Sequence, residues 1–244
     1  MKAMLFAAGL GSRLAPFTND HPKALAMVNG KTLLERNILY LQQFGIKEVI
    51  VNVHHFADQI IAAIAANNGW GSTITISDET AEVLETGGGL KKAALYFTNE
   101  PFFVVMNVDI LTDLDVNAMI AAHLQTKPLA TLAVTQRTTS RYFLFDNNGL
   151  LCGWRNTQTG QEKPADLATS CANYSQLTQW AFSGIHLIDS AVFLKMEQTG
   201  KFSMVDVYLD LMQTNTINKF DHSKGKLIDV GKPESIAQAA AIFS

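Results

Sequence analysis

Cysteine is almost absent from this chain: only Cys152 and Cys171 occur among 244 residues. They form no C-x-x-C pair, which excludes the usual cysteine spacing of a zinc site or a redox motif. Two cysteines are also too few for a disulfide framework of the kind found in small secreted domains. We therefore expect reduced thiols in a cytoplasmic protein, and whether the two cysteines pair with each other stays open.

Long hydrophobic runs and an excess of positive charge are missing as well. The first apolar stretch, residues 4–8, is broken by Gly9 and is too short for a signal peptide or a membrane span. Lys and Arg number 19 against 22 Asp and Glu, so the formal net charge is −3. A nucleic-acid-binding surface is usually basic, so we expect no nucleic-acid partner, and any anion-binding site must be confined to a small part of the surface. The short apolar run predicts no association with a membrane.

What the chain does have is an alternation of short apolar segments with segments of helical periodicity. Thr32 and Glu35 form a capping-box pair at the start of one such helix. Without an internal repeat or a linker, the pattern predicts one α/β domain with a mostly parallel sheet covered on both faces. Strands are predicted at 4–8, 48–53, 73–76, 102–106 and 129–135, and helices at 32–44, at 57–66, from the glycine cluster at 87–89 to about residue 96, and at 116–124.

The middle of the chain changes character. Residues 141–145 and 150–154 flank an Asp-Asn-Asn-Gly turn and predict a β-hairpin. Residues 156–179 are polar and lack periodicity, and a loop of this length is usually functional or mobile. A strand at 180–188, helices at 190–196 and 205–212, a strand at 227–230 and a helix from Pro233 follow. We interpret the hairpin region as a lid on one core.

The segment after the first strand has the composition of a phosphate-binding loop. Gly9, Gly11 and Ser12 permit turns that gather backbone N–H groups into one concavity, and such a nest binds anions. Arg13 adds a bidentate donor, and Lys23 adds a second cation. The dinucleotide fingerprint fails because leucine follows Arg13 where a glycine is needed, and the Walker pattern fails because no Lys-Ser or Lys-Thr follows these glycines.

Two aspartates follow predicted strands. Asp109 comes shortly after the very apolar strand 102–106, and Asp229 lies at the end of the last strand. Ligands of open α/β sheets bind in the crevice at the carboxyl ends of the strands, where both side chains are expected. Mg²⁺ takes one or two carboxylates and completes its octahedron with phosphate oxygens and water. The alternative is that either aspartate only caps a turn.

The spacing G-x-G-[ST]-R-x(n)-P-K, from Gly9 to Lys23, strongly resembles the signature loop of the sugar-1-phosphate nucleotidyltransferases. The resemblance covers nearly the whole chain and implies a Rossmann-like three-layer α/β/α core with a small β-rich sugar-binding lid. It implies one nucleotidyltransferase domain over 1–244, with a nucleotide-binding half at 1–135 and a sugar-phosphate-binding half with the C-terminal helix at 136–244. It also assigns Mg²⁺ to Asp109 and Asp229, although Lys232 replaces a threonine frequent in the family's C-terminal segment.

The resemblance further implies the roles of individual residues. Catalysis would rest on Arg13 and Lys23, and the glycines at 87–89 would precede a helix and read the base, with a positive φ expected at Gly88. A flexible glycine turn is the alternative. Nucleotide contacts are expected from Ala8, Gly9, Gly11, Ser12, Arg13, Lys23, Thr86, Gly87 and Gly88, and substrate contacts from Asn107, Gly184, Arg141 and His55.

For some side chains a purely structural role is an alternative to a functional one. We expect His54 and His55 to point at the crevice, although at least one of them fits an ordinary rim histidine. Asn52 is a candidate hydroxyl reader. Arg155 and Trp154 on the hairpin are candidate sugar-phosphate contacts, with a purely structural role equally acceptable.

The reaction implied is the transfer of a nucleotidyl group from an NTP to a sugar 1-phosphate, with Mg²⁺ as cofactor. The resemblance to short, single-domain members of the family implies UTP and N-acetylmuramate 1-phosphate as substrates, and a monomer or small homo-oligomer is expected. A mannose- or heptose-1-phosphate guanylyltransferase is one alternative, and a regulatory nucleotide-binding paralogue is another. A choline-phosphate cytidylyltransferase is a further one, with an aromatic cage formed by Trp154, Tyr174 and Trp180.

Overall fold

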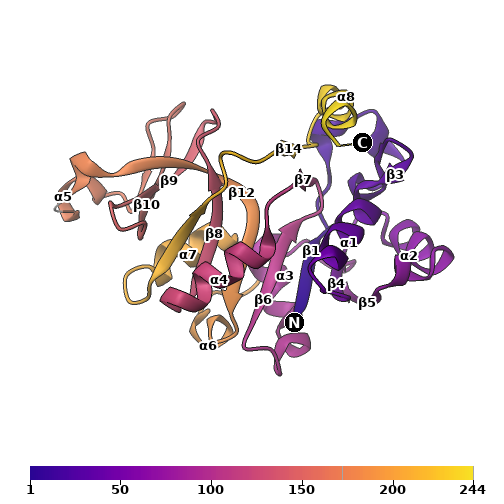
Figure 1. Ribbon diagram of the computed structural model, residues 1–244, viewed down its shortest axis with the longest axis horizontal. Coiled ribbons are helices and arrows are strands. Elements are labelled where there is room, and N and C mark those ends of the chain that lie inside the picture. The colour runs from indigo at the N-terminus through magenta and orange to yellow at the C-terminus, as the bar shows by residue number, and fades with distance from the viewer. Residues whose placement is uncertain (172, 244) are drawn as a thin grey trace.

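The computed structural model describes residues 1–171 and 173–243 and contains a ten-stranded central sheet (Figure 1). The sheet path runs β11-β10-β9-β12-β6-β1-β4-β5, with β8 and β13 attached through β12. Four parallel strands form its nucleus: β1 (Lys2–Phe6), β4 (Glu48–Val53), β5 (Thr73–Asp78) and β6 (Phe102–Asn107). The predicted α/β class with a mostly parallel sheet is confirmed. Among the described residues, no helix has both the length and the apolarity to cross a membrane.

Helices cover both faces of this sheet, which gives the predicted three layers. On one face lie α1 (Leu33–Gln43), α2 (Ala57–Ala66) and α4 (Val116–Thr126), packed on one buried apolar cluster. On the other lie α3 (Glu85–Lys92), α6 (Val192–Lys195) and α7 (Met204–Leu211), packed on a second cluster. The capping box is confirmed, because the Thr32 side chain accepts from the Glu35 amide at 3.0 Å.

One strand breaks the expected alternation. β12 (Thr178–Asp189) lies between β6 and β8 (Ala130–Thr135) and is antiparallel to both. The predicted strand at 129–135 exists, but it does not adjoin β6 as a simple βαβ series requires. β8 instead pairs in parallel with β13 (Ile217–Asp221), which the sequence analysis did not predict.

The predicted hairpin forms and extends the same sheet. β9 (Arg141–Phe145) pairs with β10 (Leu151–Asn156) and with the start of the long β12. The polar segment 156–179 is less irregular than expected, since it contains β11 (Glu162–Lys163) and α5 (Leu167–Ser170); Ala172 in this stretch lies outside the described residues. The hairpin and α5 project at the end of the molecule opposite α8 (Figure 1).

A second, two-stranded sheet joins the middle of the chain to its end. β7 (Ile110–Thr112) pairs antiparallel with β14 (Leu227–Asp229), so that Asp229 lies opposite Ile110. The terminal helix α8 (Pro233–Ile242) begins at the predicted proline and packs in a small apolar cluster beside the short strands β2 (Met27–Val28) and β3 (Lys31–Thr32). Short 3-10 helices occupy Ser12–Leu14, Phe17–Asn19, Lys23–Leu25, Asn68–Gly71, Ala93–Phe97 and Tyr174–Gln176.

Candidate functional site

A cavity of about 450 Å³ opens at the carboxyl ends of β1, β4 and β6. This is the edge of a parallel sheet at which ligands of open α/β folds bind. Most of the predicted N-terminal site residues line it. They are Ala8, Gly9, Gly11, Ser12, Arg13 and Lys23, joined by Thr86, Asn107 and Asp109.

The glycine loop forms as predicted at one of its two glycines. Gly11 has φ +64°, and a Cβ there would lie 2.9 Å from both Lys23 Cβ and Thr18 Cγ2. Its carbonyl accepts from the Leu14 amide at 2.8 Å and from Thr18 Oγ1 at 3.0 Å. A Cβ on Gly9 would meet no atom within 4 Å, and its φ lies outside the left-handed region that favours glycine. The protein itself therefore does not require glycine at this position, and only a bound ligand would.

Arg13, Lys23 and Asp109 line this cavity, and Asp229 does not line it but lies beside the lining residue Gly231. Lys23 Nζ donates to Asp109 Oδ2, and the Val230 amide donates to the Asp109 carbonyl at 2.8 Å. A Cβ on Gly231 would lie 2.7 Å from Asp229 Oδ1 and 3.0 Å from Arg13 Nη2, which places these two side chains around the same glycine. The structure therefore brings residues 13, 23, 109 and 229 together from four separate segments.

Asp229 is in an electrostatically unfavourable place. Burial raises its pKa above the ordinary value, and the charge of Asp109 raises it further. Lys23, Arg13 and Arg137 act in the opposite direction. Arg137, which sequence reasoning missed, donates to the Phe182 carbonyl at 2.9 Å. In the sequence it is only a lone arginine after a predicted strand, a pattern that does not indicate a functional role.

The donor set fits a magnesium ion. Asp229 Oδ1 is buried and has no hydrogen-bond partner among the described residues, beside a second carboxylate of like charge. Over the described part of the chain, no three His, Cys, Asp or Glu side chains are grouped to hold a metal by themselves. Two carboxylates alone suit Mg²⁺, which keeps several waters and takes phosphate oxygens from its substrate.

The second glycine cluster is placed differently from the prediction. Gly87, Gly88 and Gly89 lie inside α3, not before it, and none has a positive φ; the residue that does is Glu85, at +58°. The expected positive φ at Gly88 is therefore wrong. The glycines are needed for close packing, since a Cβ on Gly88 would lie 2.4 Å from the Gly200 carbonyl oxygen.

In the same packing, the backbone amides of Gly87 and Gly88 are already hydrogen-bonded within the protein. The Gly87 and Gly88 amides both donate to the Phe202 carbonyl, at 2.9 and 3.2 Å, and neither residue lines the cavity. Thr86 does line it, and its Oγ1 accepts from the Met204 amide at 2.9 Å.

The predicted substrate residues separate into two groups. Asn107 lines the cavity, and Gly184 lies against it: Gly184 has φ +74° at an irregularity of β12, and a Cβ there would be 2.8 Å from Asn107 Nδ2. His55 is half-buried, lies 4.0 Å from the Phe56 ring between centroids and does not line the cavity. Arg141 is exposed at the edge of the hairpin, also outside the cavity lining.

Two side chains near the cavity are bonded inside the protein. His54 Nδ1 lies 2.6 Å from the Glu79 carbonyl oxygen, which supports the rim interpretation for this histidine. Asn52 is 2% exposed, and its amide oxygen and nitrogen are both used internally. Asn52 also lines the cavity, so its interpretation as a hydroxyl reader stays a prediction, which these internal bonds do not support. Glu79, which lines the cavity, was missed, because an isolated Glu after a short strand gives no sequence signal.

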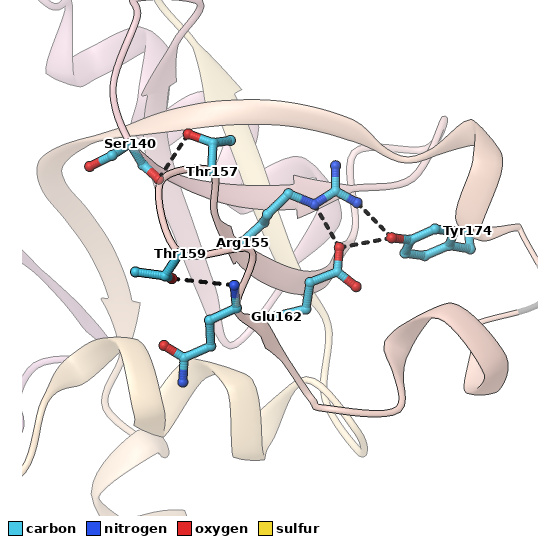
Figure 2. A network of polar contacts seen from close by, with 7 residues as sticks. Ser140, Arg155, Thr157, Thr159, Glu162 and Tyr174 are labelled. Carbon is cyan, nitrogen blue, oxygen red and sulfur yellow. Dashed lines mark hydrogen bonds and ion pairs between the residues drawn. The ribbon is translucent and has the colours of Figure 1, made fainter.

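The hairpin side chains hold one another. Arg155 Nε donates to Glu162 Oε1 at 2.6 Å; Arg155 Nη2 donates to the Tyr174 hydroxyl at 2.8 Å, and that hydroxyl donates to Glu162 Oε1 at 2.8 Å (Figure 2). Each ring of the suggested aromatic cage faces a cation of this chain: Lys163 lies over Trp154, Arg155 over Tyr174 and Lys219 over Trp180. The rings therefore do not form a cage for a quaternary ammonium. Cys152 and Cys171 are free thiols.

Comparison with known proteins identifies the class. Residues 2–243 match the sequence model of the nucleotidyl transferase family, and the chain belongs to that family. Over 109 residues it is 45% identical to N-acetylmuramate alpha-1-phosphate uridylyltransferase of Caulobacter vibrioides, a match covering 44% of this chain and 45% of the relative. The mannose-1-phosphate guanylyltransferase catalytic subunit beta of Drosophila melanogaster is 25% identical over 99% of this chain and 62% of its own length.

The matched part of the chain spans about half the length of the uridylyltransferases it resembles. Among solved structures, HddC of Yersinia pseudotuberculosis in complex with GMP-PN has a TM-score of 0.79 at 24% identity, covering 100% of this chain and 99% of that one. UDP-glucose pyrophosphorylase of Acinetobacter baumannii has a TM-score of 0.76 at 17% identity, covering 98% and 91%. These structures share the fold.

Proposed function

We propose that this protein transfers a nucleotidyl group from an NTP to a sugar 1-phosphate, giving an NDP-sugar and pyrophosphate. The observation that carries the proposal is the grouping of Arg13, Lys23 and Asp109 in the lining of one cavity at the glycine loop, with Asp229 beside the lining residue Gly231. Membership of the nucleotidyl transferase family supports it. A regulatory nucleotide-binding protein would not need a pair of carboxylates, one with an unpartnered oxygen, next to its nucleotide cavity.

The chemistry requires no protein nucleophile. An oxygen of the sugar 1-phosphate attacks the α-phosphorus of the NTP, a new P–O bond forms, and the bond to the β-phosphate oxygen breaks to release pyrophosphate. This nucleophile is already ionised near neutral pH, so positioning and charge neutralisation carry the catalysis. Arg13 and Lys23 would hold and neutralise the phosphate oxygens, in a cavity whose water content falls as the substrates enter.

Mg²⁺ would be held by Asp109 and Asp229. When bound, it supplies charge neutralisation at the transferred phosphate and pyrophosphate. Lys23 donates to Asp109, and we expect this lysine to turn toward the substrate phosphates when a divalent cation neutralises the carboxylates.

For the substrates, we propose UTP and N-acetylmuramate 1-phosphate. The supporting observation is the identity of 45% and 41% to two N-acetylmuramate alpha-1-phosphate uridylyltransferases, each over about half of both chains. A guanylyltransferase is the second candidate, favoured by matches to a heptose 1-phosphate guanylyltransferase at 35% and to a mannose-1-phosphate enzyme over nearly the full chain. The side chains over the aromatic rings of the hairpin argue against choline phosphate.

Within the site, we assign the nucleotide to the first half of the chain, 1–135, and the sugar phosphate to the remainder. Ala8, Gly9, Gly11, Ser12 and Thr86 line the cavity and would contact the nucleotide. Asn107 and Gly184 would contact the sugar. Arg141, on the hairpin strand β9 and outside the cavity lining, would reach the sugar only if the hairpin closes. His55 follows β4, also lies outside the lining, and would need a rearrangement of its own loop.

A pyrophosphate-release assay tests both levels of the proposal. Four NTPs crossed with a panel of sugar 1-phosphates should give Mg²⁺-dependent release for one pair above the others, and we expect UTP with N-acetylmuramate 1-phosphate. Preference for GTP with a mannose or heptose 1-phosphate would replace the substrates and keep the reaction. Absence of release with every pair would overturn the reaction itself.

A further inference from the structure

A buried pair of polar side chains lies directly beneath the start of the glycine loop. Asn52, on β4, accepts through Oδ1 from the Ala7 amide at 2.7 Å and from the Ala8 amide at 3.3 Å. Its Nδ2 donates to Glu79 Oε1 at 2.8 Å. Glu79 follows β5 and is only 1% exposed. The three bonds link the ends of β1, β4 and β5 at the cavity.

The polarity of this chain of bonds is fixed by chemistry. A carboxylate oxygen can only accept a hydrogen bond. Glu79 therefore requires Asn52 to direct its NH₂ group toward Glu79 and its oxygen toward the Ala7 and Ala8 amides. Were the Asn52 amide reversed, two N–H groups would face the Ala7 and Ala8 amides and neither would be satisfied. Burying a polar group without a partner is costly, which makes the reversed state unfavourable.

The third glycine of α3 is shaped to this pair. A Cβ on Gly89 would lie 2.6 Å from Glu79 Oε1 and 3.0 Å from Asn52 Nδ2. The glycine therefore allows the helix carrying Thr86 to approach the pair at van der Waals distance. The pair thus touches both segments that line the nucleotide side of the cavity, the glycine loop and α3.

We propose that Asn52 and Glu79 form a positioning pair that sets the orientation of the Ala7–Ala8 backbone against α3, and so determines how the NTP is bound. The inference rests on the proposed function only for the identity of the ligand. Because Asn52 occupies the Ala7 and Ala8 amides, the nucleotide must take its amide donors from Gly9 onward and can use only acceptors from residues 7 and 8. The pair is expected to act on nucleotide affinity and to leave the sugar-phosphate side unchanged.

A polarity swap tests this. Asn52→Asp places two carboxyl groups face to face and should raise the KM for the NTP by about tenfold to a hundredfold, the value of one hydrogen bond to a charged group. The kcat and the KM for the sugar 1-phosphate should change little. Glu79→Gln keeps an acceptor for Asn52 and should resemble the wild type. In the double variant Asn52→Asp/Glu79→Gln, the glutamine donates to the aspartate, so the KM for the NTP should return to near the wild-type value.

Calorimetric binding of each NTP to wild type and variants separates this inference from the proposed reaction, since the affinity series must follow the same order even if no turnover is found. Thr131→Val is the matched control: it removes a buried 2.9 Å contact between Thr131 and His123 away from the cavity, and should lower stability without changing nucleotide affinity. If Asn52→Asp does not fold, Gly89→Ala displaces the same pair without changing its charge and should weaken nucleotide binding. Unchanged nucleotide affinity in Asn52→Asp or Gly89→Ala, or a double variant no better than Asn52→Asp, would overturn the proposal.

Discussion

Arg13 and Lys23 have different surroundings although both are proposed to neutralise phosphate. Lys23 is paired with Asp109 and largely buried, whereas Arg13 lies beside Asp229 across Gly231. Arg13→Ala and Lys23→Ala should each lower kcat by roughly 10²–10³, the usual loss on removal of one preorganised donor. Arg13→Lys should recover only part of this loss, because a point charge replaces a planar fork. Steady-state kinetics on the preferred substrate pair measures these losses. An unchanged kcat in both alanine variants would show that these residues do not take part in catalysis.

The two aspartates should respond differently to neutralisation. Asp109→Asn and Asp229→Asn should each lose most Mg²⁺-dependent turnover, by about the same 10²–10³ or more. Only Asp229→Asn should also raise the melting temperature of the metal-free protein, because its buried carboxylate has no hydrogen bond on Oδ1 and faces the charge of Asp109. Asp109→Asn breaks an ion pair with Lys23 and should not stabilise. Thermal melts in EDTA, with and without added Mg²⁺, measure this; full Mg²⁺-dependent activity in either variant would contradict its role as a ligand.

At the scale of elements, the glycines of the N-terminal loop and those of helix α3 have different roles, which one pair of substitutions distinguishes. Gly88→Ala should destabilise by about 1–3 kcal/mol, the usual cost of overpacking, because its Cβ meets the backbone of Gly200 at 2.4 Å. Gly9→Ala has open space and should leave stability unchanged while raising the KM for the NTP. Urea denaturation beside kinetics provides the comparison. Equal stability of the two variants would mean that the α3 packing is not tight.

Local elements were largely predictable from the sequence. The strand at 48–53 and the helix at 57–66 have the predicted bounds, because a β-branched run and a helical period with flanking turns are local signals. The loop glycine at position 11 and the capping pair Thr32–Glu35 were predictable for the same reason.

Pairings between distant segments were not predictable. Nothing local in β12 indicates that it inserts antiparallel between β6 and β8, and the two short strands β7 and β14 lack the length for a periodic signal. The same limit explains the missed Glu79, whose importance comes from Asn52 and Gly89, residues close to it only in the fold. It also explains why the glycines at 87–89 were taken for a base-reading turn, when their partners are Gly200 and Phe202.

At the scale of the whole molecule, buried histidines should make stability depend on pH. His186 is fully buried on β12, where its Nδ1 lies 2.5 Å from the Tyr208 hydroxyl, and burial lowers its pKa to about 3. Burial also lowers the pKa of His123 and of His222. An unfolded histidine, with a pKa near 6.5, binds a proton that the folded state excludes, so stability is complete above about pH 6.5 and is lost as the pH falls toward 3.

Urea denaturation at pH 7 and at pH 5 should therefore show a lower free energy of unfolding at pH 5. In His186→Gln the loss between the two pH values should be smaller, even though the variant is less stable at pH 7. A loss as large as that of the wild type would show that this histidine does not carry the effect.

The pairing of β7 with β14 has a consequence for the biosynthesis of the protein. It places Asp229, close to the C-terminal end of the described chain, beside Asp109, which is translated long before it. A nascent chain can form the four parallel strands and the glycine loop before the segment that carries the second carboxylate has been translated. A chain interrupted before residue 229 would thus hold the glycine loop and Asp109 without the second proposed magnesium ligand.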